Sequence, residues 1–349
     1  MPFVVGRGEQ RDPAPSNAGR LGSYRALDGS DGAPLYVDLD APHAMLVVGK
    51  RGYGKSYTLG VLAEALARTP AIAPVIVDPI GVFTTLAAST CGDSIPAEVV
   101  RSPSVTPDSL DPRSWCPLLG LSPESGAGGL VWQAAQTESS ITEMCDVVET
   151  TNAARKHRRA AINHLNLAES WDVFDVDGLD ARHLGSPEIT VLDVSGMDGA
   201  PMNAVARGVA EALYRGRVRD EIDRLPWLLL DEAHTFFDGI AAPALETILT
   251  RGRAPGVSLV AATQRPSAIP PVGISQADVI VSHRLTSKDD LDALEAAQPT
   301  YMTSSLDERM PTAPGEVVII DDSTETVHAG TIRERITPHG GDSPTASDF

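Results

Sequence analysis

A glycine-rich segment between residues 49 and 56 has the residue types that bind phosphate groups. Glycines let the backbone N–H groups of such a loop turn inward around a β-phosphate, where side chains would block close approach. Lys55 then supplies a cation to the β- and γ-phosphates, and Ser56 offers a hydroxyl to Mg²⁺. The sequence therefore predicts a nucleotide-binding loop made of Gly49, Lys50, Arg51, Gly52, Tyr53, Gly54, Lys55, Ser56 and Tyr57.

Two adjacent carboxylates, Asp231 and Glu232, follow the apolar run Leu228–Leu230. Taken alone, an apolar run that ends in two acids is more often a strand that reaches solvent. Together with the phosphate loop, the pair predicts a hydrolytic site. Asp231 would hold Mg²⁺ with Ser56, and Glu232, on the other side of the strand end, would orient and polarise the attacking water.

A second polar strand end follows the apolar residues Val260–Ala262. Ligands of a parallel sheet lie at the carboxyl ends of its strands, so Thr263 and Gln264 would emerge beside the γ-phosphate. A polar side chain there can sense whether that phosphate is present. An ordinary turn with satisfied hydrogen bonds is an equally good interpretation of these two residues alone.

The elements that must position these residues alternate between short apolar runs and segments with helical spacing. Lys55–Arg68, Met202–Ile222 and Ala242–Arg251 have the spacing of helices. Buried parallel strands are predicted at Ala44–Val48, Pro74–Val77, Ile189–Val194, Trp227–Leu230, Val257–Ala262 and Val279–Val281. The predicted fold is therefore α/β, with a parallel sheet covered by helices on both faces.

The remaining segments divide the chain around this core. Residues 1–34 are rich in Gly, Pro, Ser and Asp and predict a flexible leader, with a short edge strand at Leu35–Asp40. The strand signal fades over residues 89–185, where Ile141–Leu167 predicts a helical insertion. The core would comprise residues 35–88 and 186–334, including strand-like segments at Val317–Ile320 and Glu325–Ile332, and residues 335–349 would be a disordered tail.

Composition restricts the class of protein. The 349 residues carry a net charge of −19 and include only four lysines against 24 arginines, a balance that resembles proteins of salt-loving archaea. Any DNA contact must therefore be local. The three cysteines are far apart and indicate neither disulfides nor a thiolate metal site. Because no apolar run approaches about 20 residues and no signal peptide is recognisable, we expect a cytoplasmic protein without membrane contact.

Five segments in this order resemble the HerA–FtsK superfamily of ATP-driven DNA-pumping motors, and HerA-like archaeal ATPases most closely. They are HAMLVVGKRGYGKS (43–56), VIVDPIG (75–81), ITVLDVS (189–195), LPWLLLDEAHTF (225–236) and RGRAPGVSLVAATQRP (251–266). The resemblance covers about half of the chain, on both sides of the predicted insertion. A RecA-like P-loop NTPase core is the fold that this resemblance implies.

The resemblance also implies roles for single residues. It makes Lys55, Glu232 and Gln264 catalytic, with ATP and Mg²⁺ as cofactors. Arg253 stands where such motors place an arginine that reaches the ATP of a neighbouring subunit, and Arg251 and Lys288 are further candidates; an exposed helix-end arginine is the alternative interpretation of Arg253. The implied assembly is a homo-oligomeric ring, a hexamer, with duplex DNA and a nuclease as partners.

Some features depart from the family or leave its function open. Fewer than fifty residues precede the phosphate loop, so we expect the usual N-terminal β-barrel to be missing. The basic cluster Arg155–Arg159 could grip DNA, although a solvated helix face is at least as good an interpretation. An ATP-dependent switch or protein-remodelling ATPase is the alternative function. The segment Asp231–His234 also suggests a DEAH-box helicase. We do not favour this interpretation, because such helicases need two tandem motor domains and the sequence predicts one.

Overall fold

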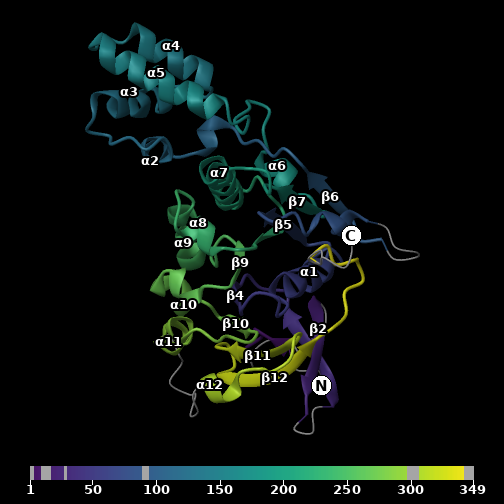
Figure 1. Ribbon diagram of the computed structural model, residues 1–349. Coiled ribbons are helices and arrows are strands. Elements are labelled where there is room, and N and C mark those ends of the chain that lie inside the picture. The colour runs from purple at the N-terminus through teal and green to yellow at the C-terminus, as the bar shows by residue number, and fades with distance from the viewer. Residues whose placement is uncertain (1–3, 9–16, 27–29, 89–93, 297–305, 342–349) are drawn as a thin grey trace, which may run out of the picture.

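The computed structural model describes residues 4–8, 17–26, 30–88, 94–296 and 306–341. Within these residues, the strands form one 12-stranded sheet in the order β1-β3-β2-β12-β11-β10-β4-β9-β8-β5-β7-β6 (Figure 1). The seven strands β10, β4, β9, β8, β5, β7 and β6 are parallel to their neighbours in this series. On the other side of β10, the pairs β10–β11, β11–β12, β12–β2 and β2–β3 are antiparallel. The predicted α/β class with a mostly parallel sheet is confirmed.

The six predicted core strands are present, with ends that differ from the prediction by no more than a few residues. They are nearly all buried because helices cover both faces of the sheet, which explains why they are continuous apolar runs. Their bounds are Ala44–Val48 (β4), Ile72–Asp78 (β5), Ile189–Asp193 (β7), Leu225–Leu230 (β8), Ser258–Thr263 (β9) and Val279–Ser282 (β10).

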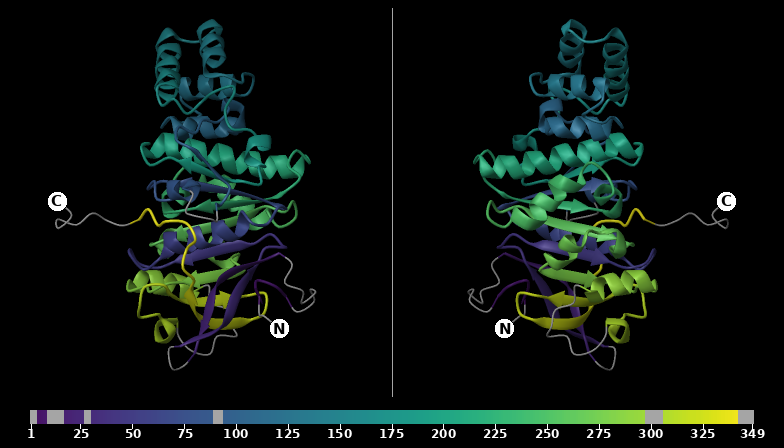
Figure 2. Two further views of the ribbon diagram at one scale, coloured as in Figure 1. Left: turned by 90° about the vertical axis from the view of Figure 1, so that its right-hand side faces the viewer. Right: turned by 90° about the vertical axis from the view of Figure 1, so that its left-hand side faces the viewer.

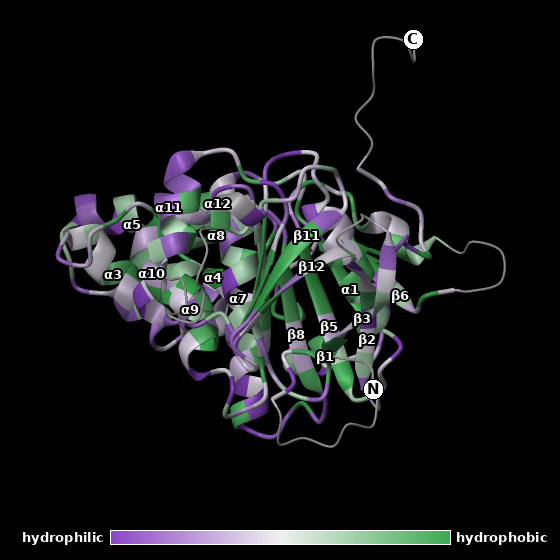
Figure 3. Cartoon of the chain, turned by 90° about the horizontal axis from the view of Figure 1, so that it is seen from below, coloured by the Kyte–Doolittle hydropathy of each residue, from purple (hydrophilic) through white to green (hydrophobic). Residues whose placement is uncertain are grey.

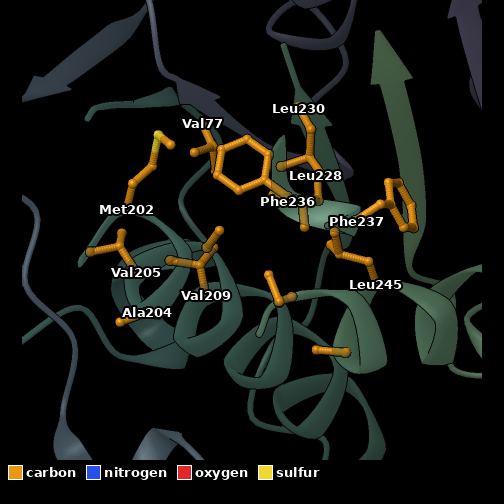
Figure 4. Packing of buried hydrophobic residues seen from close by; sticks show 14 of the residues in the cluster. Val77, Met202, Ala204, Val205, Val209, Leu228, Leu230, Phe236, Phe237 and Leu245 are labelled. Carbon is orange, nitrogen blue, oxygen red and sulfur yellow. The ribbon is translucent and has the colours of Figure 1, made fainter. Parts of the chain in front are cut away.

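Alternate side chains of these strands enter two separate apolar cores. Leu228 and Leu230 face one core and Trp227 and Leu229 the other. Helix α1 (Lys55–Leu66) covers the second core, and the first is covered by α7 (Gly199–Val218), α8 (His234–Phe237) and α9 (Ala242–Arg251) (Figures 3 and 4). The shorter helices are α6 (Ala181–Leu184), α10 (Pro271–Ser275), α11 (Lys288–Ala296) and α12 (Leu306–Arg309).

The prediction of a flexible leader over residues 1–34 is wrong for the part that the structure describes. Strands β1 (Val4–Val5), β2 (Ala18–Arg25) and β3 (Asp31–Asp38) extend the sheet beyond β11 (Glu316–Asp321) and β12 (Thr326–Ile332). β2 pairs with β3 along most of its length and with β12 at residues 22–24, despite its glycines. Pairing with distant segments outweighed a local sequence with little strand signal.

The predicted insertion over residues 89–185 needs two corrections. Its beginning contains β6 (Ala97–Val100), which pairs with β7 and belongs to the core sheet. Its helical stretch is not continuous, because residues 151–154 separate α4 (Ile141–Thr150) from α5 (Arg155–Glu169). With α2 (Trp115–Leu118) and α3 (Gly126–Ala135), these helices form a lobe beyond α7 (Figure 2).

The end of the chain also differs from the predicted tail. Residues 335–341 pack along α1, where the backbone N–H groups of Ile336 and Thr337 donate to the Glu64 carboxylate at 2.9 Å each. Residues 342–349, the rest of that prediction, lie outside the described residues. In the parts of the chain that are described, no helix combines the length and the apolar character needed to cross a membrane.

A buried histidine joins the N-terminal strands to the start of the core sheet. His43 Nδ1 lies 2.8 Å from Asp278 Oδ2, and its Nε2 lies 3.5 Å from Asp38 Oδ2. Burial by itself would lower the pKa of His43, but hydrogen bonds and charges from Asp278 and Asp38 outweigh it and raise the pKa to about 9. Arg7 also binds Asp38, so the cluster contains two acids and two cations.

This cluster predicts a loss of stability at alkaline pH. The pKa of His43 in the folded state lies above its ordinary value of 6.5, so the folded state binds a proton more tightly than the unfolded state. The protonated ring therefore contributes fully to the free energy of unfolding below pH 6.5, and this contribution is lost as the pH rises through about 9. The contribution is on the order of 3 kcal/mol. Urea unfolding at pH 6, 7.5 and 9.5 measures the free energy of unfolding of the wild type and of His43→Gln. The difference between the two proteins should become smaller as the pH rises. A difference that does not change with pH would contradict the raised pKa of His43.

Candidate nucleotide-binding site

The phosphate loop connects the end of β4 to the start of α1, as the sequence predicts. Gly49, Gly52 and Gly54 all have positive φ, at 152°, 80° and 109°. A Cβ on Gly49 would lie 2.5 Å from the Cβ of His283. Glycine is therefore required at position 49 by both conformation and space.

Residues at the end of strand β10 form hydrogen bonds with this loop. The His283 N–H donates to the Val48 carbonyl and the Lys50 N–H donates to the Arg284 carbonyl, both at 2.8 Å. The fully buried His283 ring places Nε2 2.9 Å from Thr58 Oγ1 on α1. Burial and then the charge of Lys55 lower the pKa of His283 to about 4, so the ring is neutral. The sequence does not predict this contact, because His283 lies two residues beyond the predicted strand Val279–Val281.

Lys55 begins α1 and is 6% exposed. Its Nζ donates to the Lys50 carbonyl at 3.4 Å. Burial lowers the pKa of Lys55, while the charges of Glu232 and Asp231 act in the opposite direction. The ammonium thus lies in a low-dielectric position near two acids, where a bound anion would be strongly attracted.

The phosphate loop and the acidic strand end are in direct contact. Ser56 Oγ donates to Asp231 Oδ2 at 2.7 Å, although 175 residues separate them in the chain. Asp231 is fully buried, and burial raises its pKa against the hydrogen bond from Ser56. A hydroxyl and a carboxylate side by side are ligands that Mg²⁺ accepts while keeping several waters, so these two residues fit the ion.

Glu232 has an unusual backbone conformation and an unsatisfied carboxylate. Its φ is 44°, a left-handed value that costs a non-glycine residue about 1 kcal/mol or more. Its N–H donates to Asp231 Oδ1 at 3.0 Å, which helps to hold this conformation. Its Oε2 is buried, has no hydrogen-bond partner in the described chain and lies 3.4 Å from His234 Nδ1. Such an acceptor can take a hydrogen bond from an attacking water.

His234 joins this strand end to the neighbouring one. Its Nδ1 lies 3.2 Å from the hydroxyl of Thr263 at the end of β9. Burial, followed by the charges of Arg265 and Lys55, lowers the pKa of His234, so the ring next to Glu232 is neutral at pH 7. The sequence predicts that the ends of these two strands meet, but it gives no role to His234 or Arg265, because the contacts of individual side chains are set only by the folded sheet.

These side chains open into one cleft of about 1100 Å³. Lys55, Ser56, Glu232 and the half-buried Gln264 line it together, with Arg51, Gly52, Gly54 and Tyr57 of the loop. Lys50 and Tyr53 face each other instead, with Lys50 Nζ 4.4 Å from the centre of the Tyr53 ring.

A strand-end aspartate shapes one wall of this cleft. Asp78, at the end of β5, accepts hydrogen bonds from the N–H groups of Ile80, Gly81 and Phe83 at 2.7 to 3.1 Å. These bonds fix the turn at residues 79–83, and Pro79, Ile80 and Val82 line the cleft. Asp78 therefore acts as a cap for the turn.

The structure does not bring Arg253 to this site. Arg253 lies between α9 and β9 and lines a different pocket, with His43 and Asp278, at the opposite end of the strands. Arg251 is in the last turn of α9, whereas the exposed Lys288 follows β10 and lies at the same end of the sheet as the phosphate loop. A role for Arg253 in hydrolysis would require a second copy of the chain.

Comparison with known proteins gives a family match. Residues 20–207 match the family model described as helicase HerA, central domain. This segment contains Lys55 and Ser56, whereas Asp231, Glu232 and Gln264 lie beyond it. A search of curated proteins finds no match.

Solved structures share the fold at low sequence identity. VirB4 of Thermoanaerobacter pseudethanolicus superposes with a TM-score of 0.66 at 15% identity, over 93% of this chain and 97% of that one. The bacterial conjugative coupling protein TrwBdeltaN70 gives a TM-score of 0.60 at 15% identity, over 97% and 98%. Plasmid coupling protein TrwB in complex with the GTP analogue GDPNP gives 0.53 at 15%, over 86% and 87%.

Proposed function

Because this chain belongs to the family defined by the central domain of helicase HerA, we propose that it is an ATP-hydrolysing ring motor of the HerA–FtsK type that translocates duplex DNA. One observation carries the hydrolytic part of the proposal. Ser56 and Asp231 meet at 2.7 Å, so the phosphate loop and the acidic strand end form one site. TrwB has been solved with a nucleotide analogue, which supports nucleotide binding in this fold.

Each residue of the site has a distinct task in this proposal. The loop N–H groups and Lys55 hold the phosphates and neutralise the charge that develops on the transferred phosphoryl group. Ser56 and Asp231 hold Mg²⁺, which supplies further charge neutralisation when bound. Glu232 orients and polarises the attacking water through its unpaired Oε2. Gln264, on the neighbouring strand, senses the γ-phosphate.

The ring completes the site in this proposal. A guanidinium that stabilises the transition state from a neighbouring subunit would make hydrolysis depend on assembly. Arg253 is our candidate, since its exposed side chain lies far from the site of its own chain. Lys288 and Arg251 are the alternatives at the subunit boundary.

Duplex DNA is the proposed substrate, and a nuclease is a proposed partner. The exposed Arg155, Lys156 and Arg159 lie in the first turns of α5, which has no side-chain cap. Cations are unfavourable next to the partial positive charge of a helix N-terminus, and a DNA phosphate would offset that repulsion. This local basic surface is compatible with a net charge of −19.

The proposal is tested by turnover and mass in solution. We expect Mg²⁺-dependent ATPase activity that duplex DNA stimulates, with stimulation falling as salt rises, because phosphate contacts weaken with salt. The mass should be about six times the 36.8 kDa of one chain. A monomer whose ATPase activity does not change when DNA is added would refute the motor proposal and favour an ATP-dependent switch or protein-remodelling ATPase.

The same assay addresses the arginine. Arg253→Ala should lower turnover in the assembled ring, and mixing it with Glu232→Gln subunits should restore part of the activity if Arg253 acts across the boundary. Unchanged turnover of Arg253→Ala would rule it out, and the same experiment on Arg251→Ala and Lys288→Ala would then identify the acting cation.

A further inference from the structure

We infer that the segment 331–341, here called the C-terminal strap, forms the nucleoside end of the nucleotide site, with His339 and Tyr57 as its aromatic wall. The inference rests on the proposed nucleotide binding and adds which part of the ligand the strap recognises. The strap begins with the last two residues of β12, runs along α1 and lines the same cleft as the phosphate loop (Figures 1 and 2).

Two groups of residues that line the cleft differ in chemistry. Glu232, His234 and Gln264 line the cleft and lie beside the γ-phosphate in the proposed function. The phosphate loop lines it too. The same cleft is also lined by Gly315, Thr331, Ile332, Arg333, Glu334, His339 and Gly341. With the γ-phosphate beside Glu232 and the other phosphates on the loop, the strap residues of the same cleft are left to contact the ribose and base.

A buried carboxylate on α1 anchors the strap. Glu64 is fully buried, and its Oε1 accepts hydrogen bonds from Thr337 N–H at 2.9 Å and Thr337 Oγ1 at 2.7 Å. Its Oε2 accepts from Arg333 Nη1 at 2.8 Å. Burial raises the pKa of Glu64, but the hydrogen bonds outweigh it and the pKa lies below its ordinary value. The strap is thus fixed to the helix that starts with Lys55.

A glycine in α1 makes room for this contact. A Cβ on Gly60 would lie 2.7 Å from Arg335 Cζ, so the guanidinium packs directly on the helix backbone. Glycine inside a helix costs about 1 kcal/mol relative to alanine. Close approach of the strap is the reason that the structure offers for a glycine at this position.

The strap brings an aromatic ring to Tyr57, the residue after Ser56. The His339 and Tyr57 rings lie 5.3 Å apart in an edge arrangement, and both line the cleft. The Arg335 N–H donates to the Tyr57 hydroxyl at 2.7 Å, which fixes the tyrosine ring. Both rings are partly exposed, so a flat base can contact them.

Comparing two ligands separates recognition of the nucleoside from recognition of phosphate. Calorimetric titration should measure the Kd of Mg-ATP and of Mg-tripolyphosphate for the full chain and for two variants. His339→Ala removes part of the aromatic wall. In Gly60→Ala the new Cβ pushes the guanidinium of Arg335 away, while alanine is a better helix former than glycine. We expect the Kd of ATP to rise about fivefold to tenfold in His339→Ala, as for a lost base–aromatic contact, and by a smaller factor in Gly60→Ala, where only the guanidinium of Arg335 must move. The Kd of tripolyphosphate should not change, which also shows that the variants are folded.

The controls distinguish failure of this inference from failure of the proposed function. His183→Ala, an exposed histidine beside Glu98 at the far edge of the sheet, should bind both ligands like the wild type. A ratio of the two dissociation constants equal to the wild-type ratio in both variants would overturn the inference while leaving ATP binding intact. A wild type that binds neither ligand would overturn the proposed function, and the inference with it.

Discussion

Replacing Lys55 with alanine should reduce ATP turnover by about 100-fold to 1000-fold, the usual cost of removing one group that stabilises transition-state charge. The effect should be large because the ammonium is buried, and a charge in a low-dielectric site is only weakly screened. Phosphate release at saturating Mg-ATP measures it. A variant that retains wild-type turnover would refute the assignment of the site.

The loop contains a matched control for this change. Lys50 carries the same charge five residues earlier, but its ammonium lies over the Tyr53 ring rather than in the cleft. Lys50→Ala should therefore reduce turnover by less than about tenfold, the effect of losing one partly exposed cation–π contact. Equal losses in both variants would show that net positive charge, rather than the position of Lys55, supports hydrolysis.

Replacing Glu232 with glutamine should separate hydrolysis from binding. The amide has nearly the same shape but cannot accept a proton, so turnover should fall by about 100-fold to 10,000-fold. Binding of ATP should persist, because Lys55, Ser56 and Asp231 are unchanged. Single-turnover hydrolysis and equilibrium binding measured on the same preparation would test both parts.

Another carboxylate at a strand end serves as the control. Asp193 ends β7 and accepts hydrogen bonds from the backbone N–H and hydroxyl of Ser195, at 3.1 and 2.6 Å. It does not line the nucleotide cleft. Asp193→Asn should therefore keep turnover close to that of the wild type. If Asp193→Asn lost as much activity as Glu232→Gln, the water-orienting role would not belong to Glu232 alone.

The sequence was sufficient wherever short-range pattern and chemistry agree. The apolar run at Ala44–Val48, the glycines after it and the helix from Lys55 identify the phosphate loop, because few other local structures satisfy those residues together. Strands buried on both faces, such as Leu225–Leu230, are equally easy to recognise because they are continuous apolar runs. The acidic pair and Gln264 could be added because parallel strands place their carboxyl ends at one edge of the sheet.

Contacts between segments far apart in the chain were decided only by the tertiary structure. β2 is a strand because β3 and β12 pair with it, and β6 is one because β7 does; neither segment has a strong strand pattern of its own. The same holds for the strap, whose polar residues are ordered by the buried Glu64.

Chemistry-bearing residues alone therefore determined the type of site, and the fold determined its boundaries. Lys55, Ser56, Asp231 and Glu232 were recognisable because nucleotide hydrolysis restricts which residue types and spacings can serve. The neighbours His234, His283 and His339 were not, because a histidine's role depends on what surrounds it, and burial and nearby charges are fixed only when distant strands and the strap pack together. The position of Arg253 at the far end of the sheet is likewise a result of folding that no local pattern contains.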